Sequence, residues 1–133
     1  TYISYYDSSN LPSSIATNTS DSWVTTTVYS NGPVGKYTSI ALDSSGKAHI
    51  SYIEDSSKNF LKYATNASGS WVKKTLDRSG SSGWFSSIAL DSSDKAHISY
   101  GDSHNHALKY ATNASVSWVK TTVDTGGEHI YSD

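Results

Sequence analysis

Residues 39–52 read SIALDSSGKAHISY, and residues 87–100 repeat them as SIALDSSDKAHISY, a shift of 48 residues with one change. A run of this length that recurs almost unaltered indicates an internal repeat, and a repeat predicts the architecture before any single motif does. The chain has 133 residues, so at this period it holds slightly fewer than three copies.

Two shorter segments recur after 47 or 48 residues. LKYATNAS at residues 61–68 returns at residues 108–115, and Ser-Trp-Val occurs around Trp23, Trp71 and Trp118. The three tryptophans therefore occupy one position of the repeat, and we expect them to staple the outermost strand of each unit.

The copies divide the chain into approximate repeats at 1–36, 37–83 and 84–133. The chain enters the first copy part-way, because residues 2–5 (YISY) match residues 49–52 (HISY).

Each copy reads as four short strands: SIALD, AHISY, LKYAT and WVKTTV. Apolar and polar residues alternate within these stretches, and Asp, Ser, Gly and Asn separate them, which is the strand-and-turn pattern. In the first stretch Ile40 and Leu42 face one side, and Ser39 and Ala41 face the other. Thr, Val, Tyr and Ser dominate throughout and disfavour helix, so the predicted class is all-β.

Four short antiparallel strands in about 48 residues resemble a blade of a β-propeller, and the resemblance covers essentially the whole chain. The turn DSSGK at residues 43–47 is similar to the Asp-x-x-Gly-x turn of many propellers, among them NHL-type, sialidase-type and lectin-like repeats. The resemblance implies about three four-stranded blades. It indicates an architecture and no activity.

Propellers typically close with about four to eight blades, so the resemblance implies a ring completed by oligomerisation. The first blade lacks its own innermost strand. Residues 129–133 match residues 87–91 if the preceding loop is shortened, and would then supply that strand to another copy; on a gapless alignment the chain stops just before it. The exposed edge would recruit a strand. We expect a homodimer with six blades, or alternatively a homotrimer with nine. The other interpretation is a fragment paired with the remainder of a longer propeller.

Composition disfavours several other classes. Hydrophobic residues make up 35%, aromatic residues 12% and charged residues 17% of the chain, which is too aromatic for disorder and too sparingly charged for a coiled coil. Ten Lys and Arg against 12 Asp and Glu leave a net charge of −2 and no basic stripe, so we expect no nucleic-acid partner. No apolar run is long enough for a transmembrane helix, so we expect no membrane partner. Cysteine is absent, and the compartment stays open.

Catalytic signatures are weak. Sialidase-like propellers carry Ser-x-Asp-x-Gly-x-Thr-Trp, but residues 65–71 read TNASGSW, with Ala67 in place of the Asp. Such enzymes also resemble one another in three arginines that grip the substrate carboxylate, and this chain contains one, Arg78. No nucleophile–base pair or carboxylate pair departs from the repeat. We therefore expect a protein that is not an enzyme and needs no cofactor.

Histidines supply the weak candidates for a metal site. His104 and His106 share a loop after Asp102, but a metal site wants three or four ligands with supporting partners. We interpret them as solvated loop residues and predict no metal. His49 and His97 occupy one repeat position with no carboxylate adjacent in sequence, which favours a structural role.

The candidate ligand-binding residues share one predicted rim, where aromatic residues lie just before first strands and acidic residues follow second strands. They are Tyr37, Trp84, Phe85, Tyr131, Asp55 and Asp102. A flat ring suits the apolar face of a sugar, and nearby carboxylates suit its hydroxyls. Lectin-like propellers bind sugars between blades on such a rim. The alternative is that the acidic residues cap turns.

Three functions compete on this sequence. The main interpretation is a non-enzymatic, self-assembling propeller subunit that acts as a scaffold or binding module. The alternative is a carbohydrate-binding propeller with sites between blades. A glycoside hydrolase ranks last.

Overall fold

The computed structural model describes most of the chain. The described residues are 1–6, 13–18, 22–29, 34–55, 58–79 and 81–126.

Within these residues the chain forms strands and no helix. The strands are β1 (Tyr2–Tyr6), β2 (Ser13–Asn18), β3 (Trp23–Tyr29), β4 (Val34–Leu42), β5 (Ala48–Glu54), β6 (Phe60–Thr65), β7 (Val72–Asp77), β8 (Ser82–Leu90), β9 (Ala96–Asp102), β10 (Ala107–Thr112) and β11 (Val119–Thr125). The described part of the chain accordingly has no helix of the length and apolarity that a membrane crossing requires. The prediction of an all-β chain is confirmed.

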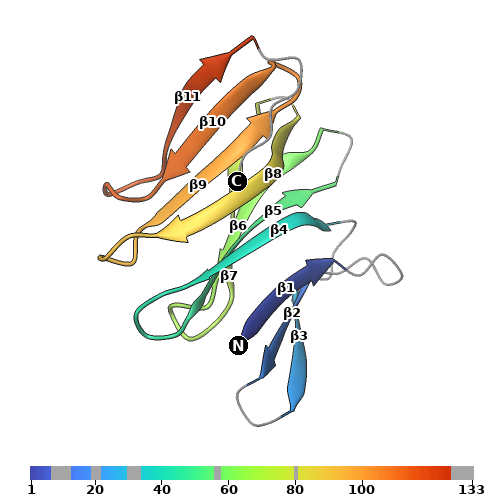
Figure 1. The fold of residues 1–133 in the computed structure, drawn as a ribbon, viewed down its shortest axis with the longest axis vertical. Coiled ribbons are helices and arrows are strands. Elements are labelled where there is room, and N and C mark those ends of the chain that lie inside the picture. Colours follow the sequence, from blue (N-terminus) through green and yellow to red (C-terminus); the bar gives the residue numbers. More distant parts are fainter. Residues whose placement is uncertain (7–12, 19–21, 30–33, 56–57, 80, 127–133) are drawn as a thin grey trace.

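The strands form three antiparallel sheets in chain order. The first sheet has the order β1-β2-β3, the second β4-β5-β6-β7 and the third β8-β9-β10-β11. Every strand pairs with its neighbour in sequence, as the short turns between the predicted strands require. Figure 1 shows the three sheets following one another along the long axis of the molecule. Two four-stranded antiparallel sheets are thus confirmed.

The strands β4 and β8 start earlier than the sequence pattern predicted. We expected them to begin at Ser39 and Ser87, but β4 begins at Val34 and β8 at Ser82. Each pairing with its neighbour contains two register shifts before the regular part begins. Such bulges break the alternation on which the prediction rested, so the early residues did not read as strand.

The hydrophobic core lies between the sheets. One cluster joins Val28 of β3 to Ile50 and Tyr52 of β5. A second cluster joins the second sheet to the third and has Leu61, Tyr63, Leu76, Ile88, Ala96, Ile98, Tyr100 and Ala111 as its buried members. Neighbouring residues of β4 serve both clusters, since Ile40 packs against the first and Ala41 against the second. The predicted opposition of these two side chains is therefore observed.

Two of the three repeat tryptophans pack against the hydrophobic clusters between the sheets. Trp118 precedes β11 of the third sheet and meets Tyr63 of the second sheet edge-on, with ring centroids 4.9 Å apart. Trp71 packs against the cluster that joins the first and second sheets. Trp23 is 50% exposed. The expectation of a staple on the outermost strand did not include the packing of Trp118 on the preceding sheet.

The turn DSSGK closes the hairpin between β4 and β5, and its counterpart closes the hairpin between β8 and β9. The Asp43 carboxylate accepts hydrogen bonds from the backbone N–H groups of Ser45 at 2.9 Å and Lys47 at 2.7 Å. Gly46 has φ 74°, and Asp94 at the equivalent position has φ 58°. The Asp94 carboxylate also accepts a hydrogen bond from the N–H of Ser44 at 2.8 Å, which ties the two hairpins together.

Replacing Gly83 by alanine tests how closely the third sheet approaches the second. Gly83 has φ +95°, and a Cβ there would lie 3.0 Å from Ile53 Cγ1 and 3.0 Å from the backbone Cα of Leu61. We expect G83A to lower the free energy of unfolding by about 2–4 kcal/mol, from backbone strain and overpacking together. Chemical denaturation measures the loss.

Gly46→Ala is the matched control for G83A. Its φ is +74°, but nothing lies within 4 Å of an added Cβ. We expect a loss of about 1 kcal/mol from strain alone. Equal losses in the two variants would show that the close packing at Gly83 carries no weight.

Candidate functional site

Three of the predicted aromatic residues meet at the junction of the second and third sheets. Tyr37 comes from β4, and Trp84 and Phe85 come from β8. The centroid of Tyr37 lies 5.3 Å from that of Trp84 and 4.7 Å from that of Phe85, and the last two are 6.4 Å apart. These separations are those of interacting aromatic pairs. We call these three residues the aromatic cluster.

The bulges of β4 and β8 position the aromatic cluster, and they place it inside the strands rather than before them as predicted. Tyr37 has φ 53° and Phe85 has φ 51°, one repeat apart. A bulky side chain at positive φ is rare and costs about 1–3 kcal/mol, so the surroundings must hold it there. Ser86 contributes to this, because its hydroxyl donates to the Tyr37 carbonyl at 3.1 Å and meets the Ser51 hydroxyl at 2.9 Å.

The aromatic cluster is accessible from solvent. Tyr37 is 38% exposed, and Trp84 and Phe85 are half-buried. The Trp84 indole N–H donates to the Ser81 hydroxyl at 2.9 Å, and the Asn59 amide donates to the same hydroxyl at 3.2 Å. The orientation of the indole is therefore set by a hydrogen bond as well as by packing.

A charged pair lies next to the aromatic cluster. Lys36 Nζ is 2.5 Å from Asp55 Oδ2, and both side chains are partly exposed. The hydrogen bond from Lys36 to Asp55 raises the pKa of the lysine. Lys36 precedes Tyr37 in β4, so this ion pair links Asp55 to the strand that carries Tyr37. That Asp55 takes part in ligand binding stays a prediction.

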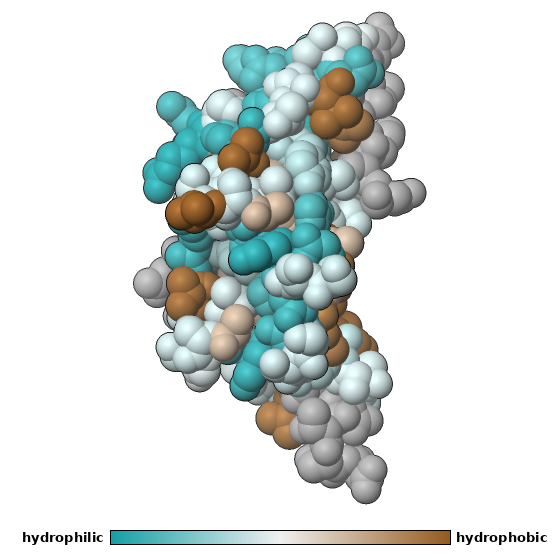
Figure 2. Space-filling view, turned by 90° about the vertical axis from the view of Figure 1, so that its left-hand side faces the viewer, coloured by the Kyte–Doolittle hydropathy of each residue, from teal (hydrophilic) through white to brown (hydrophobic). Residues whose placement is uncertain are grey.

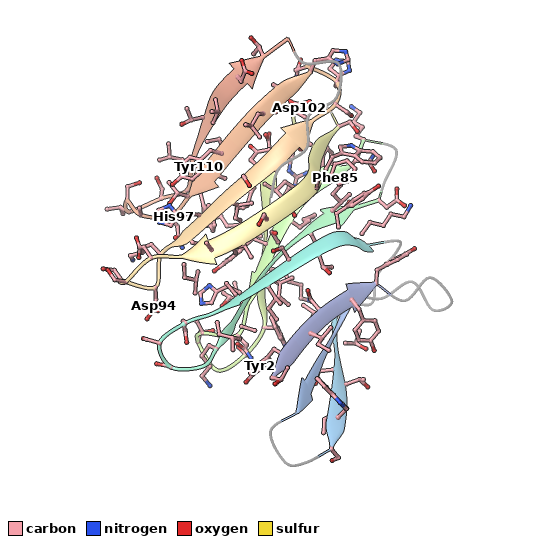
Figure 3. All side chains as sticks on the ribbon, viewed as in Figure 1. Tyr2, Phe85, Asp94, His97, Asp102 and Tyr110 are labelled. Atoms are coloured by element: carbon pink, nitrogen blue, oxygen red, sulfur yellow. The ribbon has the colours of Figure 1, made fainter. Side chains whose placement is uncertain are left out.

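Asp102 does not lie on this surface. Its side chain is fully buried, and its carboxylate contacts Lys109 Nζ at 2.6 Å and accepts the side-chain amide of Asn105 at 2.8 Å. Burial alone would raise the pKa of Asp102, but the hydrogen bonds from Lys109 and Asn105 outweigh it and hold the pKa below its usual range. Figure 3 labels Asp102 and Phe85 near the same end of the molecule. The structure thus gives Asp102 structural partners instead of an open face.

The remaining predicted site residues form no cluster in the described part of the chain. Tyr131 lies outside the described residues. His104 and His106 are exposed. Among the described residues, no three His, Cys, Asp or Glu side chains gather in a way that could hold a metal ion.

Sequence reasoning missed Asp77, which ends β7 and lines a small pocket. The pocket measures about 120 Å³, and its lining residues are Asp77, Ser79, Lys109, Lys120, Thr121 and Thr122. The buried Asp77 carboxylate accepts hydrogen bonds from the Ser79 hydroxyl at 2.6 Å and the Tyr100 hydroxyl at 2.8 Å. It also contacts Lys109 Nζ at 3.3 Å and Lys120 Nζ at 3.0 Å. The carboxylate is fully engaged and joins the second sheet to the third.

The charge on Asp77 is stabilised by these partners. Burial would raise its pKa, but the hydrogen bonds from Ser79, Tyr100 and Lys120 outweigh it and hold the pKa well below the usual range. Burial and the bond to Asp77 raise the pKa of Tyr100, which therefore remains a donor. The only sequence signal was Asp124, the residue at the equivalent position of the last repeat.

Each described histidine of the repeat is held between a tyrosine and an aspartate. His49 Nδ1 lies 2.6 Å from the Tyr63 hydroxyl, and His49 Nε2 lies 3.5 Å from Asp43 Oδ2. His97 makes the same contacts with Tyr110 and with Asp91, the latter at 3.1 Å. Figure 3 shows His97 and Tyr110 together, away from Phe85.

The aspartates that orient these histidines come from the hairpin turn, six residues upstream in both copies. This constant spacing was the signal that the search for an adjacent carboxylate overlooked. Burial raises the pKa of Tyr63, so this hydroxyl stays protonated. The arrangement recurs and binds hairpin to strand, which supports a structural role.

The hairpins between β4 and β5 and between β8 and β9 project at the opposite end of the molecule (Figure 1). Seen from that side, hydrophobic residues form patches separated by hydrophilic ones (Figure 2). Among the described residues, the aromatic cluster is where the predicted site residues meet with rings partly open to solvent.

Replacing Asp77 by asparagine tests the buried network. We expect D77N to lower the free energy of unfolding at pH 7 by about 3 kcal/mol, because two lysines lose a buried partner. The folded-state pKa of Asp77 is lowered, so its contribution is present above the ordinary carboxyl pKa and is lost as the pH falls below it. Denaturation at several pH values should show the two proteins converging in acid.

Asp55→Asn is the control for D77N, because it removes a carboxylate from a partly exposed ion pair. A loss below about 1 kcal/mol is expected for such a pair. If D55N costs as much as D77N, the buried network has no special role.

Comparisons with known proteins place the chain by fold alone. No known family model matches it, and no curated protein matches its sequence. Among solved structures it is similar to a fucose lectin from Kordia zhangzhouensis in complex with methyl-fucoside, with a TM-score of 0.60 and 16% sequence identity. The match covers 94% of this chain and 90% of the lectin chain, so the shared fold extends over nearly the whole of both.

Proposed function

We propose that this chain is a carbohydrate-binding protein and that the aromatic cluster is its ligand site. The observation that carries the proposal is the meeting of Tyr37, Trp84 and Phe85 across two sheets, with rings partly open to solvent. Aromatic faces pack against the C–H face of a sugar ring. The strained backbone at Tyr37 and Phe85 adds support, since such strain gathers at functional sites.

Polar groups beside the aromatic cluster suit sugar hydroxyls. Asp55 offers carboxylate oxygens as acceptors, and Lys36 offers an ammonium donor. The Ser81 hydroxyl already accepts from Trp84 and Asn59, so it serves chiefly to orient the indole. A site with aromatic walls and a few polar groups is the usual form of a small-ligand site.

The fold neighbour suggests the first ligand to test. It was solved with methyl-fucoside, and its fold matches this chain over nearly its full length. At 16% identity the likeness supports the choice of probe and nothing about individual contacts. Methyl-fucoside is therefore the first probe, and a glycan array gives the wider search.

We also propose that binding takes place without catalysis or a cofactor. The buried acidic groups that could serve as acids or bases, Asp77 and Asp102, are already paired with lysines. The described histidines of the repeat are held by tyrosine and aspartate partners. These contacts favour a binding module over a hydrolase.

The three sheets are, on this proposal, blades of a partial β-propeller that self-assembles into a ring. Support comes from contacts between the strands nearest the junctions, because β4 contacts both β1 and β8. Two copies would give a six-bladed ring, which we favour, and three copies would give nine blades. The ring then acts as the scaffold that presents the sugar sites.

Replacing Trp84 by alanine tests the sugar site. We expect W84A to weaken binding of methyl-fucoside, or of the best sugar on the array, by about thirtyfold or more, as the loss of a central aromatic contact does. Tyr37→Ala should act in the same direction, and titration calorimetry measures both. A thermal melt must show that each variant stays folded.

Trp23→Ala is the control for W84A, because Trp23 is a half-exposed tryptophan on the first sheet. Its affinity per site should equal that of the wild type. Wild-type protein that binds no sugar on the array, or W84A and Y37A variants that bind as tightly as the wild type, would contradict the proposal.

A further inference from the structure

One contact repeats between successive sheets of the chain. The fourth-strand residues Val28 and Leu76 each lie in the cluster that their sheet shares with the next. They are 3% and 8% exposed. The next sheet contributes an isoleucine of its second strand to the same cluster. These residues are Ile50 of β5 and Ile98 of β9, and they are 2% and 0% exposed. We call the surface that carries the isoleucine the front face of a sheet and the other surface its back face.

The front face of the first sheet has the same residues but no sheet against it within the described chain. Ile3 stands at the position of Ile50 and Ile98, and it is 47% exposed. Trp23 stands at the position of Trp71 and Trp118, both of which are packed, and it is 50% exposed. The side chains that elsewhere cover a preceding sheet therefore face solvent here.

The back face of the third sheet carries the residues against which such a front face packs elsewhere in the chain, and here they are uncovered. Val123 stands at the position of Val28 and Leu76, and it is 60% exposed. Tyr110 stands at the position of Tyr63, which is 6% exposed where Trp118 covers it. Tyr110 itself is only half-buried. Its partner His97 is likewise more exposed than His49, with side-chain values of 31% against 6%.

We propose that these two faces bind each other in successive copies of the chain, with Trp23 of one copy on Tyr110 of the next and Ile3 beside Val123. This surface rests on the proposed ring and names the residues that close it. The occupant is a second copy because residues at the same repeat positions already meet within one chain: the apolar packing on an isoleucine occurs twice, and a tryptophan on a tyrosine occurs once. The interface is a continuation of the interfaces between the sheets.

A polar contact accompanies the apolar one. Between the second and third sheets the Tyr100 hydroxyl donates to Asp77 at 2.8 Å. Tyr5 and Asp124 stand at the corresponding positions of the first and third sheets. Across the interface between copies, the Tyr5 hydroxyl would donate to Asp124 of the neighbouring copy. The front and back faces thus carry matching hydrogen-bonding groups as well as matching apolar residues.

The mass in solution is the first test. Light scattering and sedimentation equilibrium should give twice the chain mass of 14.3 kDa, and three times that mass would support the same surface in a nine-bladed ring. Val123→Asp places a charge on the back face, in the edge strand β11. We expect it to raise the dissociation constant by about thirtyfold or more, because the aspartate would be buried unpaired. Trp23→Ala should weaken association in the same way.

Val116→Asp is the matched control, since Val116 is fully exposed in the turn before Trp118. The same chemical change there should leave the mass unaltered. A wild-type chain that remains monomeric, or a V123D chain that associates as tightly as the wild type, would overturn the proposal.

Cross-linking identifies the faces directly, because the chain has no cysteine. A short bismaleimide should join Ile3→Cys chains to Val123→Cys chains in a mixture. Each variant alone should yield little linked dimer. Linking within the Val123→Cys sample alone would mean that two back faces meet, which contradicts the head-to-tail contact.

Sugar binding separates this proposal from the proposed function. The aromatic cluster lies within one chain, so monomeric V123D should bind methyl-fucoside with the wild-type affinity per site. If V123D is monomeric while the wild type binds no sugar, the surface stands and the sugar site fails. If sugar binds but V123D still associates, the reverse holds.

Discussion

Packing of one sheet's back face on the next sheet's front face is the interaction on which the rest of the molecule depends. A sheet of four short strands has little stability alone, so it must pack its apolar residues against another sheet. Here Ile40 and Ala41, adjacent in β4, serve the clusters on opposite sides of their sheet. Figure 1 shows the resulting succession of sheets. The hairpins and bulges are arranged around this stacking.

The packing of the second sheet on the third also brings the residues of the aromatic cluster together. Tyr37 and Phe85 occupy a left-handed backbone conformation that a free strand would leave. Ser86 helps to hold it, because its hydroxyl donates to the Tyr37 carbonyl. Two residues before Phe85, Gly83 lets β8 approach Ile53 and Leu61 of the second sheet, with no room for a side chain. The aromatic cluster therefore presents rings from two sheets at one place.

The strands and hairpins could be predicted from the sequence because each depends on interactions between residues close together in the chain. The period of two and the Asp-Ser-Ser turn need only neighbouring residues, and they predicted β5, β6, β9 and β10 closely. It did not reach the starts of β4 and β8, because bulges erase the alternation there. It also missed Asp77, whose partners Tyr100, Lys109 and Lys120 come from another sheet. Contacts between repeats are invisible to a pattern read within one repeat.

Because the copies are nearly identical, a position at which they differ can indicate a specific role. Position 36 is lysine, whereas position 84, which lies 48 residues later, is tryptophan. A junction that presents Tyr37 against Trp84 and Phe85 therefore occurs once among the described residues of the chain. If the aromatic cluster is the sugar site, as proposed, one chain offers it once, and avidity arises only when such a site is multiplied. The proposed association of copies through their end faces would multiply it, which connects the two proposals.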